Sequence, residues 1–102
     1  MSPREVQPPR GSYTGRHKVY SNVARDWNKL CQSKPAAMRS CYIELAEHPF
    51  PPGQLRRHHR LKGKLKDFWE YEVTGGERVR YKRGRNGEVL VVYAGSAPSD
   101  TH

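Results

Sequence analysis

At 102 residues the chain is long enough for one domain with a single modest core. Only 34% of its residues are hydrophobic, and 19 Lys and Arg against 10 Asp and Glu give a formal net charge of +9. The sequence has neither a run of about 20 apolar residues, as a membrane-spanning helix needs, nor the apolar segment of a signal peptide. We therefore expect a cytoplasmic protein without a membrane partner, whose charge attracts anionic polymers first and acidic protein segments second.

Residues 1–16 combine three prolines and two glycines with few apolar side chains. This composition predicts a flexible N-terminal arm, followed by a single domain over residues 17–102. A short extended piece is expected around His17–Tyr20.

Two amphipathic helices come next. The first is expected from Ser21, as its N-cap, to about Gln32, and the second from Pro35 to before Pro49. Their apolar residues recur at spacings of three and four: Val23, Ala24, Trp27, Leu30 and Cys31, then Ala37, Met38, Cys41, Tyr42 and Leu45. This pattern predicts a hairpin of two helices, whose apolar side must be covered by another layer of the protein.

The two cysteines, Cys31 and Cys41, are ten positions apart, which matches none of the closely spaced ligand patterns of zinc sites. We interpret both as reduced thiols in the core, as a cytoplasmic chain favours. The sequence also contains no group of carboxylates and histidines typical of a metal site. We therefore expect no metal and no other cofactor.

A proline-rich loop, Pro49–Gly53, precedes the strongly basic segment 56–66, which holds six cations and two histidines in eleven residues. That density of charge exceeds what solubility requires. We interpret the segment as a track for phosphate groups, whose binding weakens steeply as salt is added.

From Asp67 onward the hydrophobic pattern has a period of two, which predicts strands. Two of them flank Gly75-Gly76, and Asn86-Gly87 predicts a tight turn before a last strand from Val89 to Ala94. Because this last strand is apolar on both faces, we expect it in the centre of the sheet.

The register of the hairpin around Gly75-Gly76 follows from its charges. A three-residue loop that includes Glu77 pairs Val73 with Val79, Tyr71 with Tyr81, Glu72 with Arg80 and Glu70 with Lys82. The sequence thus predicts an α+β domain, in which an N-terminal helical hairpin packs on one face of a small, mainly antiparallel twisted sheet. The other face carries the charge.

Three segments carry a resemblance to a known family: His59-Arg60-Leu61-Lys62-Gly63, Phe68-Trp69 and Glu77-Arg78-Val79-Arg80-Tyr81. Their order and spacing resemble the RelE/ParE superfamily of bacterial toxins, most of all the YoeB, YafQ and HigB types. In that pattern a "basic or His-x-Leu-x-Gly" element precedes an Arg-hydrophobic-x-Tyr strand by nineteen residues. The resemblance covers residues of about 20–102 and implies the RelE-like microbial RNase fold.

The resemblance also implies an activity. Such a chain is expected to be the toxin of a type II toxin–antitoxin system, an endoribonuclease that cuts mRNA in the ribosomal decoding site and so inhibits translation. Its expected partners are mRNA, 16S rRNA and a cognate antitoxin.

Three residues are expected to be catalytic by this resemblance. His59 falls where YafQ-like toxins carry a histidine and YoeB-like toxins a glutamate, and Arg78 falls on the arginine that contacts the scissile phosphate. The last residue, His102, is similar to the catalytic histidine that ends HigB-type toxins, although Thr101 stands where those have tyrosine.

These residue types suit RNA cleavage by the neighbouring 2′-hydroxyl without a metal ion. Histidines can take and give protons near neutral pH, and a guanidinium stabilises the charge that builds on phosphorus. Glu70 and Glu72 are alternative bases. The expected RNA-binding residues are Arg56, Arg57, Arg60, Lys62, Lys64, Lys66, Arg80 and Lys82.

Two other functions stay open at this point. One is a ParE-like toxin that has the same fold and inhibits DNA gyrase by binding. The other is a non-catalytic basic nucleic-acid-binding module, in which the histidines are incidental.

Overall fold

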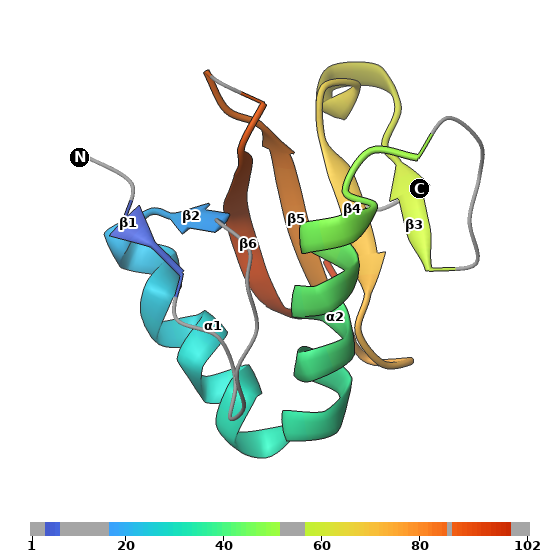
Figure 1. Cartoon of the computed structure of the whole chain (residues 1–102). Coiled ribbons are helices and arrows are strands. Elements are labelled where there is room, and N and C mark those ends of the chain that lie inside the picture. The colour runs from blue at the N-terminus through green and yellow to red at the C-terminus, as the bar shows by residue number, and fades with distance from the viewer. Residues whose placement is uncertain (1–3, 7–16, 52–56, 86, 99–102) are drawn as a thin grey trace.

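The computed structural model describes residues 4–6, 17–51, 57–85 and 87–98. Its elements are β1 (Arg4–Glu5), β2 (His17–Val19), α1 (Ser21–Ser33), α2 (Pro35–Glu47), β3 (His58–Arg60), the 3-10 helix η1 (Gly63–Leu65), β4 (Trp69–Glu72), β5 (Glu77–Arg83) and β6 (Val89–Ser96). The helices form a V-shaped hairpin over one face of the sheet (Figure 1). The predicted α+β fold is confirmed.

The six strands form one sheet in the order β1-β2-β6-β5-β4-β3. Among the described strands β2 and β6 run parallel, and all other neighbours are antiparallel. The strand β6 lies between β2 and β5, which confirms its predicted central place.

The strand β1 lies within the predicted arm, residues 1–16, and pairs with β2. Val6, directly after it, is buried in the core. Residues 1–3 and 7–16 lie outside the described residues, so the flexibility of the arm as a whole stays a prediction.

The apolar faces of both helices pack against the sheet as predicted. Buried there are Val23, Trp27 and Leu30 of α1 and Met38, Cys41, Tyr42 and Leu45 of α2, with Ala24, Cys31 and Ala37 partly buried beside them. Both cysteines are free thiols. Within the described ranges, neither helix has the length and apolar character needed to cross a membrane.

The N-cap of the first helix lies one residue earlier in the sequence than predicted. Tyr20, not Ser21, is its N-cap: Tyr20 has extended backbone angles, and its carbonyl accepts hydrogen bonds from the N–H groups of Val23 and Ala24. No side-chain hydrogen bond caps this end within the described part of the chain. Ser21 is therefore already the first residue of the helix.

The hairpin between β4 and β5 also has a different register from the predicted one. Glu70 lies opposite Arg80, Glu72 opposite Arg78 and Tyr71 opposite Val79. All four predicted pairs are therefore wrong: Glu70–Lys82, Glu72–Arg80, Tyr71–Tyr81 and Val73–Val79. The loop is 74–76 rather than 75–77, because the Thr74 hydroxyl accepts hydrogen bonds from the N–H groups of Gly76 (3.2 Å) and Glu77 (3.1 Å). A shift of two positions leaves every side chain on its predicted face.

A buried histidine joins the second helix to the sheet. His58 of β3 is 2% exposed, with Nδ1 3.4 Å from the Tyr81 hydroxyl and Nε2 3.3 Å from Oε2 of Glu44. The Tyr81 hydroxyl donates to the carbonyl of Pro49 at 2.6 Å. Burial lowers the pKa of His58 below its usual 6.5, and the nearby Glu44 carboxylate opposes part of that effect.

We predict that stability decreases as the pH falls through 6.5 because the unfolded chain then binds a proton at His58 more readily than the folded chain does. Urea unfolding between pH 7 and pH 5 measures this loss, whose slope for one proton is at most about 1.4 kcal/mol per pH unit. A His58→Gln variant should lack this component, and the exposed His48→Gln control should keep most of it, because His48 is the smallest of the influences on the pKa of His58. Equal pH dependence in both variants would contradict the assignment.

Candidate functional site

The face of the sheet away from the helices carries two rows of polar side chains. Residues directly opposite one another on paired strands share a face. By that rule one row contains His59, Glu70, Arg80 and Tyr93, and the next contains Arg57, Glu72 and Arg78. We call these seven residues the polar face.

Glu70 is the centre of the polar face. It is 4% exposed, and each of its carboxylate oxygens faces a different guanidinium. Oε2 accepts a hydrogen bond from Nε of Arg80 at 3.0 Å, and Oε1 lies 3.5 Å from Nε of Arg78. A buried charge is tolerated only when it is paired in this way. Glu70 therefore fixes both arginines at neighbouring positions.

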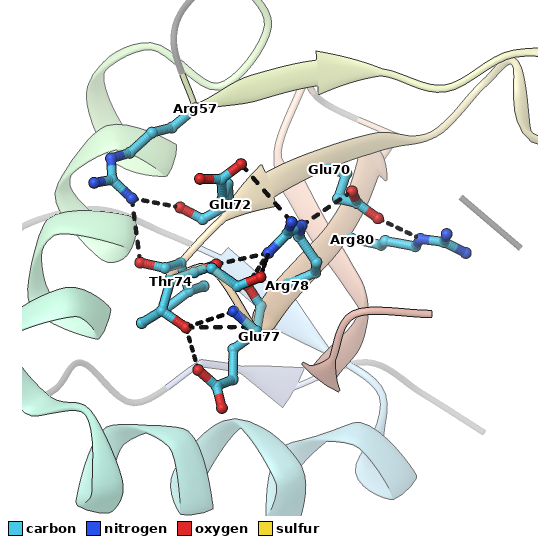
Figure 2. Close-up of polar contacts among 10 residues, drawn as sticks. Arg57, Glu70, Glu72, Thr74, Glu77, Arg78 and Arg80 are labelled. Carbon is cyan, nitrogen blue, oxygen red and sulfur yellow. Dashed lines mark hydrogen bonds and ion pairs between the residues drawn. The ribbon is translucent and has the colours of Figure 1, made fainter. Parts of the chain in front are cut away.

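Arg78 is held from a second side by the hairpin loop. Its Nη1 donates to the carbonyl oxygens of Thr74 (2.6 Å), Glu77 (3.0 Å) and Gly75 (3.3 Å). Among the described residues its Nη2 has only a long ion pair, 3.8 Å, with Oε1 of Glu72 (Figure 2). The side chain of Arg78 is 18% exposed and that of Glu72 is 37% exposed. Nη2 is thus the guanidinium nitrogen with the weakest contact to the described residues.

His59 and Arg57 border this cluster from the edge strand. His59 is partly exposed and lies opposite Glu70, which places the Cβ atoms of the two residues about 5 Å apart. Arg57 is exposed, and its Nη1 donates to the carbonyl oxygens of Glu72 (3.0 Å) and Val73 (3.3 Å). Both side chains thus lie beside the arginine pair.

The remaining predicted RNA-binding cations do not form one line. Lys82 lies on the same face as Arg80, with its Nζ 5.4 Å from the ring centre of Phe68, whereas Arg60 points toward the helix-covered face. Lys62, Lys64 and Lys66 are exposed around η1. The turn into η1 needs a glycine, because Gly63 has a φ of +64°. Arg56 and His102 lie outside the described residues.

Two residues near the site had no predicted role. Tyr93 stands in the row of Arg80, and its hydroxyl donates to the carbonyl of Ser96. Arg83 follows Lys82 and lies over the Phe50 ring, 4.1 Å from its centre. The alternation along each strand predicts which face of the sheet each of these side chains takes. The contact of Arg83 with Phe50 could not be predicted, because the two residues are far apart in the sequence.

This arrangement can bind an anion and move protons. The partly exposed guanidinium of Arg78 can offer a donor to a phosphate oxygen, the buried Arg80 adds positive charge beside it, and a carboxylate and a histidine are adjacent. Within the described ranges, no three His, Cys, Asp or Glu side chains are grouped as metal ligands.

No protein-family model matches the chain, and no curated protein is significantly similar to it in sequence. Solved structures are similar in fold. A YoeB/ParE toxin from Agrobacterium tumefaciens has a TM-score of 0.65 at 15% identity, over 80% of this chain and 98% of that one. The YoeB–YefM complex from Staphylococcus aureus gives 0.66 at 9% identity, over 84% and 100%. The DinJ–YafQ toxin–antitoxin complex from E. coli gives 0.60 at 16%, over 82% and 93%.

The chain therefore has the fold of the YoeB and YafQ toxins across most of its length. This confirms the predicted structural resemblance to the RelE superfamily. At these identities the likeness concerns the fold, and the roles of individual residues rest on the geometry of the polar face.

We predict that Glu70→Ala lowers the free energy of unfolding by about 3–5 kcal/mol because it leaves two arginines without their buried counter-charge. Urea denaturation measures the change. Glu72→Ala is the matched control: its side chain is 37% exposed, so its loss should cost less than about 1 kcal/mol. Equal losses in the two variants would show that Glu70 does not organise the cluster.

Proposed function

We propose that the chain is the toxin of a type II toxin–antitoxin system and cuts mRNA, without using a metal ion, in the decoding site of the ribosome. The observation that carries this proposal is the pair of arginines fixed by the buried Glu70 on the face of the sheet away from the helices. The shared fold with the YoeB and YafQ toxins supports the same function.

In the proposed reaction a 2′-hydroxyl of the RNA attacks the adjacent phosphorus. The new 2′-oxygen–phosphorus bond forms while the bond from phosphorus to the 5′-oxygen breaks. His59 takes the proton of the 2′-hydroxyl, and His102 gives a proton to the departing 5′-oxygen. Arg78 and Arg80 stabilise the additional negative charge on the phosphate oxygens.

The contacts of Arg78 indicate how a phosphate would reach it. Its Nη1 and Nε groups are already held by the loop carbonyls and by Glu70. Of the residues that the structure describes, its Nη2 faces only Glu72, at 3.8 Å, and Glu72 is the more exposed of the two glutamates. An incoming phosphate oxygen can replace Glu72 at Nη2 without disturbing the contacts that hold the guanidinium in place.

The two glutamates remain alternative bases with different prospects. Both oxygens of Glu70 face arginines, so we assign it mainly a positioning role. Glu72 is partly exposed, and its carboxylate is released when a phosphate takes its place at Arg78. If cutting requires Glu72 and does not require His59, then Glu72 of β4 is the residue that accepts the proton of the 2′-hydroxyl.

An antitoxin is the expected protein partner. The YoeB–YefM and DinJ–YafQ structures are complexes of this kind, and their toxins share the fold of this chain. We propose that an acidic or amphipathic segment of the antitoxin covers the polar face and displaces the terminal residues of the toxin, as the charge of +9 favours. A co-encoded small protein that forms no complex with the chain would count against this partner.

We predict that expression in a bacterium arrests growth with mRNA cut inside translated regions, and that Arg78→Ala abolishes the cuts. Arg78→Lys should leave only weak cutting, because one ammonium group cannot keep the contacts to Glu70 and to the loop carbonyls and still offer a fixed donor to the phosphate. Primer extension on cellular mRNA locates the cuts. Arg85→Ala, an exposed change in the turn after β5, is the control and should cut normally.

Other outcomes identify the competing functions. Growth arrest with intact transcripts would favour gyrase inhibition, and normal growth at good expression would favour a plain binding module. Full cutting by a His59→Ala, His102→Ala double variant would remove both histidines from proton transfer. Circular dichroism of each variant separates loss of chemistry from loss of fold.

A further inference from the structure

A concave site lies at the end of the sheet where β4 begins and β5 ends. That end of the sheet is at the top in Figure 1. Its cavity volume is about 360 Å³. We call it the Trp69 pocket. It is lined by Arg60, Lys66, Asp67, Trp69, Lys82 and Arg83.

Three of the four cations of the Trp69 pocket are oriented by uncharged neighbours. The Nε of Arg60 donates to the carbonyl of Lys66 at 3.4 Å. Arg83 lies over the Phe50 ring and Lys82 over the Phe68 ring. Such contacts limit where the charged groups can go without neutralising them.

The charge of this pocket is not balanced. None of its four cations forms an ion pair with any carboxylate of the described residues, whereas Arg78 and Arg80 both pair with Glu70. Only one acidic residue, Asp67, lines the pocket against these four cations. An anion is therefore attracted here without first displacing an internal carboxylate.

The aromatic wall of the pocket is the indole of Trp69. Trp69 is partly buried, packing edge-on against Phe50 with ring centres 5.9 Å apart. It still lines the cavity, unlike Trp27, which is 1% exposed in the core. An aromatic surface beside several cations is the combination that binds single-stranded nucleic acid by stacking and phosphate contact.

The pocket is also continuous with the polar face. Lys82 lies two residues after Arg80 on β5, about 7 Å further along the strand and on the same face. Arg60 and Trp69 are opposite each other on the other face. A bound RNA strand that extends from Arg80 would thus reach Lys82 first. It would then turn around the end of the sheet to Arg60 and Trp69.

We propose that the Trp69 pocket binds one nucleotide of single-stranded RNA, with its base against the indole and its flanking phosphates on the four cations. This inference rests on the proposed function, because it takes RNA to be the substrate. The volume suits a single nucleotide, at the small end of ligand pockets. An acidic peptide could use the cations, but it has no need of the aromatic wall.

The test uses a short 2′-O-methyl oligouridine, which lacks the free 2′-hydroxyl required for cleavage. Its binding to the full chain should quench the fluorescence of the partly exposed Trp69. Lys82→Ala/Arg83→Ala should weaken binding at least about tenfold and make the slope of log affinity against log salt shallower by about 1.4, from two lost phosphate contacts. Arg25→Ala/Lys29→Ala, which removes the same charge from exposed positions of α1, should leave the slope unchanged.

Stacking is tested separately. Trp69→Leu should weaken binding about 5- to 100-fold, and Trp69→Phe should recover most of the affinity because it keeps an aromatic ring.

If Arg80→Ala weakens binding but none of the pocket variants does, the pocket is not an RNA site, although the proposed function stands. Cutting in cells without any oligonucleotide binding overturns the pocket alone, and absence of both overturns both proposals. Quenching by polyglutamate as strong as by RNA would assign the pocket to an acidic protein.

Discussion

The carboxylate of Glu70, buried between the guanidinium groups of Arg78 and Arg80, is the interaction on which the polar face depends. A charge at 4% exposure is stable only if its partners remain in place, so the pairing holds the arginines as firmly as the arginines hold Glu70. Flexible surface arginines would lose side-chain entropy each time they bound a phosphate. In this fold the side-chain entropy is lost during folding. The guanidinium groups are therefore already oriented when an anion binds.

The hairpin loop is the second part of this arrangement. The Thr74 hydroxyl closes the loop, and the carbonyls of the loop hold Nη1 of Arg78. The same turn sets the register that puts Glu70 opposite Arg80. Local chain geometry and the charge cluster therefore stabilise each other, while His58 and Tyr81 secure the opposite face of these strands to α2 and Pro49.

Much of this architecture could be predicted from the sequence because alternation and helical spacing report which face a side chain takes. The register of the hairpin could not be predicted, because a loop of 75–77 leaves the side chains on the same faces and also pairs opposite charges. The hydrogen bonds to the Thr74 hydroxyl decide in favour of the loop 74–76. The N-cap at Tyr20 depended on backbone angles rather than on residue type. The Trp69 pocket was missed because Phe50, which orients Arg83, comes from a distant loop.

The central claim is that the polar face cuts RNA by using the RNA's own 2′-hydroxyl. The most direct measurement is single-turnover cleavage of a ribosome-bound message that has one 2′-deoxynucleotide on the 5′ side of the scissile phosphate. We predict that the all-ribose message gives a 2′,3′-cyclic phosphate end and that the deoxy message stays intact at this bond. Cleavage of the deoxy message at the same bond and rate would contradict the account, because the attacking oxygen would then have to come from water.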